Sequence, residues 1–347
     1  MTTQPNDVGR PSGRRLPTMR DLAAHVGVSR QLVSLVMRGA PGPSPATRER
    51  VLAAADELGY HANASARLLA QTRTHLVGAL FNLRNPFESR VVERLSVRAP
   101  ERGFRVVLAP VTDEHGTERL IGEMLEQRIE ALVGFITASE MHVVDRVVGM
   151  IPVVVLGERA QDDRFDNVHI DDAVAMRLAV DHLVAFGHRD IAYLGGADGA
   201  VARDRDRGYR EAMASTGLAE RIDVVGGTGW GEEDGARAAR ELLSRERLPT
   251  AIVCCSDTSA LGVLAVFWKA GVRVPEDISV IGFDDSYVAA LSYNALTSIR
   301  QDVDSTVAET VESMIERIAD PSALPRSVLT APVLTQRSST GPARSDP

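Results

Sequence analysis

Residues 18–37, TMRDLAAHVGVSRQLVSLVM, predict two short helices joined by a tight turn. Thr18 can cap the first helix, and Asp21 at the N3 position of the first turn can complete a capping box. Gly27 supplies the backbone conformation that ends this helix, and Ser29 can cap the next one. Two short helices with this spacing are typical of a helix-turn-helix that reads DNA.

The second helix of the pair has one apolar side and one mostly polar side. Leu32, Val33 and Val36 share the side that packs inward. The opposite arc consists of Arg30, Gln31, Ser34, Leu35 and Arg38. An amphipathic helix pair with a solvated polar face is the alternative interpretation, and the segments that follow weigh against it.

A third helix completes an N-terminal headpiece over residues 16–62. Ser44 and Pro45 start this helix, apolar side chains repeat along it from Val51 to Leu58, and Gly59 ends it. Residues 63–74 form a segment too short to be a stable helix alone, and we expect it to be a hinge helix or linker. Residues 1–15 and 341–347 are predicted to be disordered tails.

Charge is divided unevenly along the 347-residue chain, which carries a net charge of −8. Residues 1–75 hold ten arginines and five acidic residues, a net charge of +5, so the remainder carries −13. The basic end is therefore the end that meets DNA, and the acidic body is repelled from phosphate.

Other signals in the sequence exclude several classes of protein. Residues 1–15 contain no apolar run, so we expect neither a signal peptide nor a membrane anchor. We therefore expect the protein to be cytoplasmic. Cys254 and Cys255 lie within an apolar strand and are interpreted as core residues. We expect no metal and no cofactor, because the sequence lacks metal-ligand spacings, nucleotide-binding glycine motifs and nucleophile motifs. An enzyme is accordingly disfavoured.

From residue 75 onward, apolar runs of strand length alternate with helical stretches. This alternation predicts an α/β fold in which helices cover both faces of parallel sheets. The predicted strands and helices are too many for one compact sheet, so two linked Rossmann-like lobes fit the pattern better than a single one.

Motifs spread over the whole chain resemble one family. They are VGVS at 26–29, SPATRERV at 44–51, ELGY at 57–60, NAxARxL at 63–69, NPF at 85–87, GHRDI at 187–191, VPEDISVIGFDD at 274–285 and LTSIRQ at 296–301. These motifs and their order along the chain resemble those of the lactose-repressor and purine-repressor family of bacterial transcription regulators. The resemblance implies two lobes of periplasmic-binding-protein type within residues 75–340. It places the N-lobe at about 75–171 and 302–327, and the C-lobe at about 172–301 and 328–340.

The resemblance also implies how DNA is bound. We expect Arg30, Gln31 and Leu35 to contact base edges in the major groove. Phosphate contacts are expected from Thr18, Ser29, Ser34, Arg38 and Asn63. Leu69 is expected to insert into the minor groove as a wedge that kinks the duplex. The partners implied are a near-palindromic double-stranded operator and a second copy of the chain, with a tetramer left open.

Polar residues follow the predicted strands at the ends where ligands gather in parallel sheets. Through the resemblance, we expect effector contacts from Phe87, Glu88, Arg205, Ser256, Asp257 and Asp284. An arginine and a carboxylate suit bidentate recognition of sugar hydroxyls, and an aromatic face such as Phe87 can pack on the ring. A helix cap or a surface ion pair is the alternative role for each of these residues taken singly.

Four positions depart from the family pattern. Glu88 stands where an aromatic residue is common, Gly157 replaces an acidic residue, and Ser256 replaces the usual Asn. Leu35 lies on the reading helix where Arg is often found, so it can face a thymine methyl group. These changes bear on which effector and which operator are bound, while the class of protein stays the same.

The sequence thus predicts a DNA-binding transcription regulator, a repressor in our interpretation, whose operator affinity is set by a sugar or sugar derivative between the lobes. A nucleoside or purine corepressor is the alternative ligand, and whether the ligand releases or tightens DNA stays open. A secreted solute-binding protein would share the two lobes, but the headpiece and the lack of a predicted signal peptide argue against it.

Overall fold

The computed structural model describes residues 17–60, 73–112, 114–159, 164–197, 199–226 and 229–344. The chain divides into two units between Arg73 and Thr74. The predicted hinge at 63–74, with Asn63 and the Leu69 wedge, falls almost entirely outside the described residues, as do the N-terminal tail and residues 345–347 of the C-terminal one.

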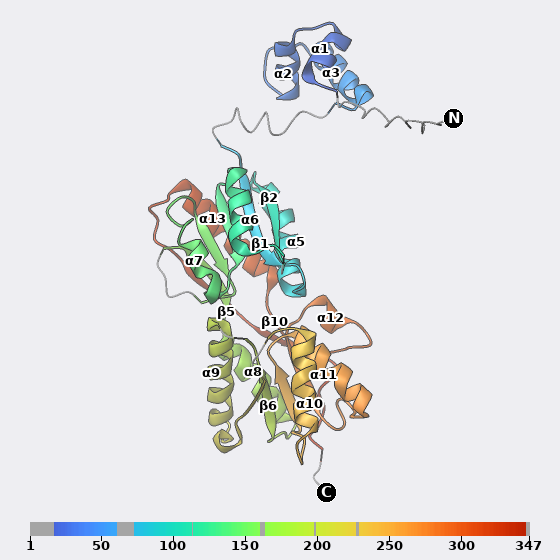
Figure 1. The fold of residues 1–347 in the computed structure, drawn as a ribbon, viewed down its shortest axis with the longest axis vertical. Coiled ribbons are helices and arrows are strands. Elements are labelled where there is room, and N and C mark those ends of the chain that lie inside the picture. The colour runs from blue at the N-terminus through green and yellow to red at the C-terminus, as the bar shows by residue number, and fades with distance from the viewer. Residues whose placement is uncertain are drawn as a thin grey trace, which may run out of the picture. The chain divides into compact units, whose positions relative to one another are not determined.

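The first unit contains three helices (Figure 1): α1 (Met19–Val26), α2 (Arg30–Met37) and α3 (Pro45–Leu58). Each begins at a hydroxyl cap, and α1 ends at Gly27, whose φ of 73° is the left-handed conformation that glycine adopts without strain. Leu22, Val33 and Val51 come from different helices and are fully buried together. This small core fixes α2 on the other two helices.

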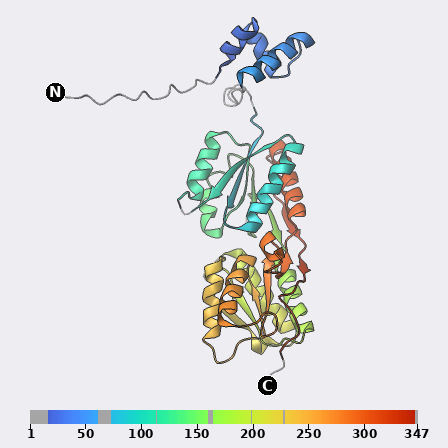
Figure 2. The ribbon, with the colours of Figure 1, turned by 90° about the vertical axis from the view of Figure 1, so that its right-hand side faces the viewer.

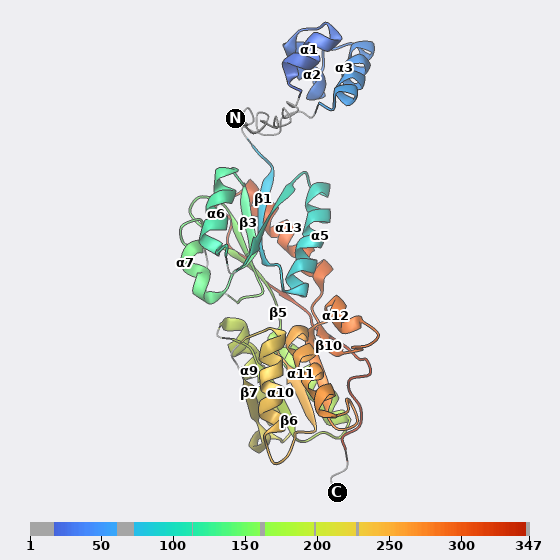
Figure 3. The same ribbon diagram turned by 45° about the vertical axis from the view of Figure 1, so that its right-hand side comes forward.

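The second unit consists of two lobes, each built on its own sheet (Figure 2). The N-lobe sheet is parallel and has the order β11-β5-β4-β3-β1-β2. Its strands are β1 (Leu76–Asn82), β2 (Arg105–Val111), β3 (Ala131–Phe135), β4 (Val153–Leu156), β5 (Asp166–Ile170) and β11 (Ser327–Thr330). Figure 3 shows α6 (Thr117–Glu126) and α7 (Met141–Val144) on one side of this sheet, and α5 (Pro86–Glu101) and α13 (Val303–Ala319) on the other.

The C-lobe sheet has the order β12-β10-β9-β8-β6-β7 and is parallel except for β12. Its strands are β6 (Ile191–Gly195), β7 (Asp223–Gly226), β8 (Ala251–Cys254), β9 (Ser279–Asp284), β10 (Thr297–Arg300) and β12 (Val333–Thr335). The helices pack in two pairs, α8 (Asp172–Ala185) with α9 (Ala200–Ser215) and α10 (Glu232–Leu243) with α11 (Asp257–Ala270). The short helix α12 (Tyr287–Ala290) follows β9.

The described chain passes between the lobes at three places: after β5, after β10 and after β11. The sequence placed the last passage at about residue 328, and the structure has it slightly later. Strand β11 continues to Thr330 because Val328 and Leu329 pair with β5 of the N-lobe. The passage comes at residues 331–332, where Pro332 cannot donate to a ladder.

The alternating α/β pattern is confirmed, with corrections at particular elements. Short strands β5, β7, β10, β11 and β12 lacked the long apolar runs that predicted the other strands. Cys254 and Cys255 are free and buried, as expected for core residues. Among the helices described, none combines the length and apolar composition of a membrane span.

Candidate functional site

The outer face of α2 carries the residues predicted to meet DNA bases. Arg30, Gln31 and Arg38 are exposed, whereas Ser34 and Leu35 are half-buried. Val33 and Val36 on the opposite face are buried, so these polar side chains are held on a fixed helix and point away from the core. The face has the shape and chemistry that an α-helix needs to enter a major groove.

The predicted phosphate contacts Thr18 and Ser29 both act as helix caps. Thr18 Oγ1 hydrogen-bonds Asp21 Oδ2 at 2.7 Å, and Ser29 Oγ accepts from Leu32 N at 3.1 Å. Their side chains are therefore committed to the helix ends. The contacts themselves stay predictions.

Two arginines of α3 bond the C-terminal ends of the other two helices, a role that sequence reasoning missed. The Arg48 guanidinium donates to Val36 O at 3.3 Å and Ala40 O at 2.7 Å, beyond the last turn of α2. Arg50 donates to Val26 O at 2.9 Å, at the end of α1. These groups satisfy helix carbonyls that lack a partner inside the helix. A basic residue in this headpiece is therefore not automatically a DNA contact.

In the second unit, Arg205 forms the centre of the candidate effector site. It extends from α9 and is buried, with its Nε donating to Asp172 Oδ1 at 2.8 Å and its Nη1 to Cys255 O at 2.5 Å. The guanidinium lies 3.4 Å from the Phe283 ring centroid and 5.5 Å from that of Trp230. The Arg205 guanidinium is thus held in place by a carboxylate and two aromatic rings.

Asp284 ends β9 and turns toward the same cation. Its φ of 110° is unusual for a residue with a side chain, and its Oδ1 accepts from Gln301 Nε2 at 2.7 Å. Burial raises the pKa of Asp284 to about 7, against the lowering effects of Arg205 and Gln301, and the charge of Glu88 raises it further. Backbone strain of this kind gathers at functional sites.

Phe87 and Glu88 lie in the N-lobe at the start of α5. Phe87 packs edge-on against Phe135, with ring centroids 5.9 Å apart. Glu88 accepts from Asn82 N at 2.6 Å and from Asn85 Nδ2 at 3.0 Å. Burial raises the pKa of Glu88 to about 7 although both of these hydrogen bonds lower it. Its charge also raises the pKa of Asp284, which belongs to the other lobe.

Ser256 and Asp257 have partners inside the C-lobe that favour a structural role. Ser256 caps α11, accepting from Ser259 N at 3.0 Å. Asp257 accepts from Ser286 N and Ser286 Oγ, both at 2.7 Å, and from Ser298 Oγ at 2.6 Å. Burial first, and then the charge of Asp284, raise the pKa of Asp257 to about 8. The alternative that these residues are helix caps and internal polar contacts gains support here.

Sequence reasoning missed four residues that contact Arg205 or Asp284: Asp172, Trp230, Phe283 and Gln301. Phe283 and Gln301 lie within the motifs at 274–285 and 296–301, so their place in the sequence could have suggested them. Asp172 and Trp230 approach Arg205 only because α8, α9 and the segment before α10 fold together. No sequence pattern marks them.

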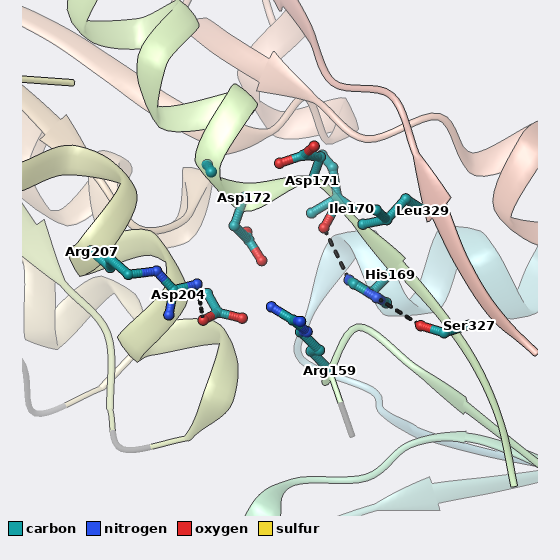
Figure 4. Close-up of a pocket in the computed structure, with 10 residues that line it drawn as sticks. Arg159, His169, Ile170, Asp171, Asp172, Asp204, Arg207, Ser327 and Leu329 are labelled. Carbon is teal, nitrogen blue, oxygen red and sulfur yellow. Dashed lines mark hydrogen bonds and ion pairs between the residues drawn. The ribbon is translucent and has the colours of Figure 1, made fainter. Parts of the chain in front are cut away.

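A cavity of about 290 Å³ lies beside the passages between the lobes (Figure 4). Arg159, Asp172 and Asp204 point into it, and His169 and Ser327 form part of its wall. Asp172 also holds Arg205, but none of the predicted effector residues lines this cavity. Asp284 at the end of β9 and Cys255 just after β8, which accepts from Arg205, lie at the carboxyl ends of the strands, where ligands in parallel sheets bind; the effector contacts stay predictions.

Two family models match this chain. One describes bacterial regulatory proteins of the lacI family and matches residues 18–63. The other describes a periplasmic binding protein-like domain and matches residues 180–340. The first covers the helix-turn-helix unit, and the second covers most of the C-lobe.

Similar proteins extend these matches over nearly the whole chain. The HTH-type transcriptional regulator CelR of Thermobifida fusca is 34% identical, covering 94% of this chain and 99% of that protein. A structure of the lac repressor dimer bound to operator and the anti-inducer ONPF is 27% identical, with a TM-score of 0.79, covering 94% of this chain and all of that one. A CelR–cellobiose complex is 31% identical, with a TM-score of 0.68, covering 93% and 99%.

Proposed function

Because this chain belongs to the lacI family of bacterial regulatory proteins, we propose that it is a repressor whose hold on its operator is set by a sugar between the lobes. It is a DNA-binding transcription regulator with a helix-turn-helix unit and a two-lobed unit. The observation that carries the proposal is the cluster at the strand ends of the C-lobe sheet, where the Arg205 guanidinium lies over the Phe283 ring and interacts with the charge of Asp284.

A sugar fits this cluster by its chemistry. Carboxyl and guanidinium groups recognise vicinal hydroxyls, and the half-buried Trp230 offers a face on which a sugar ring can pack. The related CelR has been solved with cellobiose, which is consistent with a saccharide ligand here. A ligand that contacts both lobes stabilises one lobe arrangement over another, and this difference is what can control DNA binding.

The proposal includes a dimer that sets two headpieces on a near-palindromic operator, as in the lac repressor dimer. Arg30, Gln31 and Leu35 are the proposed base contacts. The relatives are named as regulators, so we propose a ligand-controlled switch without catalysis, working in the cytoplasm.

Footprinting of the full chain on the DNA flanking its own gene tests this function. We expect protection of a near-palindromic site, with affinity falling steeply as salt rises. Gln31→Ala should weaken specific binding about tenfold or more, since a good bidentate base contact contributes ~1–3 kcal/mol. Asp56→Ala, on α3, is the matched control and should leave specific binding intact. Equal affinity for every duplex would contradict the proposal.

A further inference from the structure

The chain enters the two-lobed unit at Thr74 and His75, directly before β1. Thr74 is 3% exposed, and its Oγ1 donates to Arg128 O at 2.6 Å. The same hydroxyl accepts from Leu76 N, the first residue of β1, at 3.4 Å. The backbone N–H of His75 donates to Glu130 Oε1 at 2.9 Å. Both bonds that leave the entering chain therefore end on the loop between α6 and β3.

The start of β2 holds the entering chain from the other side. Arg105 N donates to His75 O at 2.8 Å, and the rings of His75 and Phe104 meet edge-on with centroids 5.7 Å apart. Because β1 lies between β2 and β3 in the sheet, the entry is fastened on both sides. We call these residues the entry clamp: Thr74, His75, Phe104, Arg105, Arg128 and Glu130.

Two residues of the entry clamp have backbone angles that residues with side chains rarely adopt. The φ of His75 is 54° and that of Arg128 is 59°, both in the left-handed region. Such angles cost free energy and persist only where the surrounding contacts hold them. The bond from Thr74 ends on one of these residues, and the bond to Glu130 begins at the other. The clamp thus holds one direction of the backbone at the entry.

We propose that the entry clamp sets which spacing of operator half-sites the regulator accepts, with Thr74 and Glu130 as positioning residues. The inference rests on the proposed function, because it needs a dimer that sets two headpieces on one operator. Neither residue has to touch DNA for this role. They act by fixing the direction in which the chain leaves β1 toward the predicted hinge.

Two headpieces on one operator behave as two linked binding groups. The second headpiece binds at a high effective concentration when its link places it at its half-site, and at a low one when link and half-site disagree. One added base pair moves a half-site by about 3.4 Å along the duplex and by about a tenth of a turn around it. A fixed direction at the entry penalises this move, whereas a free joint would let the headpiece follow the half-site.

The experiment measures binding of the full chain to three duplexes. One carries the site protected in the footprint, and the others carry that site with one base pair added to its centre or removed from it. We expect the wild-type chain to bind the unaltered site about tenfold tighter or more than either altered site. This ratio of affinities is the quantity that the clamp should control.

Thr74→Val keeps the size of the side chain and removes its hydroxyl, so the bond to Arg128 O is lost. The ratio should then fall to about threefold or less, because the joint is looser. Thr74→Ser keeps the hydroxyl, is the matched control and should keep the wild-type ratio. A variant that was merely less stable would lose affinity for all three duplexes by the same factor, so the ratio separates positioning from stability.

Glu130→Ala removes the bond from His75 N and should lower the ratio in the same way, whereas Glu130→Gln keeps an acceptor oxygen and should preserve it. This pair decides the question if Thr74→Val does not fold. A wild-type ratio of threefold or less, or an unchanged ratio in the folded variant that lacks its bond, would overturn the inference while the proposed function stands. Failure to protect any site in the footprint would instead contradict the proposed function, and the inference would fall with it.

Discussion

At the scale of single residues, the buried carboxyls of the candidate effector site link stability to pH. Burial raises the folded-state pKa of Asp284 from 3.8 to about 7, so the folded state holds this proton more tightly than the unfolded chain does. The stability that the proton gives is complete at low pH and is lost as the pH rises through about 7. Asp257, with a pKa of about 8, adds to the same trend.

We therefore expect the second unit to unfold at a higher temperature at pH 6.5 than at pH 8. The free energy of unfolding should fall with rising pH by at most ~1.4 kcal/mol per pH unit for each carboxyl that is protonated in the folded state and ionised in the unfolded chain. Asp284→Asn should flatten the dependence because it removes one titrating group, and calorimetric melting at both pH values measures this. Asp277→Asn, at an ion pair between the half-buried Asp277 and the exposed Arg273, is the control and should leave the slope between these pH values unchanged. An unaltered slope in Asp284→Asn would show that the carboxyl does not titrate in this window.

At the scale of elements, the reading helix α2 depends on α3 for its C-terminal support. Arg48 bonds two carbonyls there, Val36 O and Ala40 O, and is half-buried. Arg48→Met should destabilise the headpiece by about 1–2 kcal/mol, since charge-assisted hydrogen bonds contribute this much. Amide hydrogen exchange in α2 of the full chain should speed up roughly tenfold, and operator affinity should fall with it.

Arg20→Met, on the exposed side of α1, should leave the exchange of α2 unchanged. This comparison separates arginines that build the headpiece from those that bind DNA, a distinction that charge counting alone cannot make. If Arg48→Met weakened DNA binding without altering exchange, Arg48 would be a DNA contact instead.

The sequence was most informative about elements whose ends carry caps and whose faces are clearly apolar. Thr18, Ser29 and Ser44 were predicted to start the three helices of the headpiece and Gly27 and Gly59 to end the first and third, and the structure has them at those helix ends. The candidate effector site was only partly predictable. Arg205 and Asp284 lie in recognisable motifs, but the Asp172 and Trp230 contacts depend on packing between segments far apart in the chain, which no local pattern encodes.

At the scale of the whole two-lobed unit, Glu158 connects the lobes directly. It follows β4 in the N-lobe, and its Oε2 accepts from Ala200 N at the start of α9, the helix that bears Arg205. A carboxylate at a helix N-terminus stabilises the folded protein by ~0.3–1 kcal/mol. Glu158 stabilises only those lobe arrangements in which it contacts Ala200. Glu158→Ala should therefore shift the lobe equilibrium by about twofold to fivefold.

Because effector and operator sense the same equilibrium, both affinities should change in Glu158→Ala. Opposite changes would identify a ligand that releases DNA, and parallel changes a ligand that tightens it. Titrations of Trp230 fluorescence and of operator binding measure the two. Glu126→Ala, at the end of α6, is the control, and a change in one affinity alone would mean that this contact does not couple the sites.

The three passages between the lobes have a genetic consequence. The last two strands, β11 and β12, lie within residues 327–335, yet one belongs to each sheet. A stop codon just before residue 327 would spare more than nine-tenths of the 347 codons and still remove an edge strand from both lobes. The gene cannot be cut into one fragment per lobe either. The strands of each sheet come from separate segments of the chain, and segments of the other lobe lie between them. Nonsense and frameshift mutations near its end should thus abolish the regulator as completely as early ones.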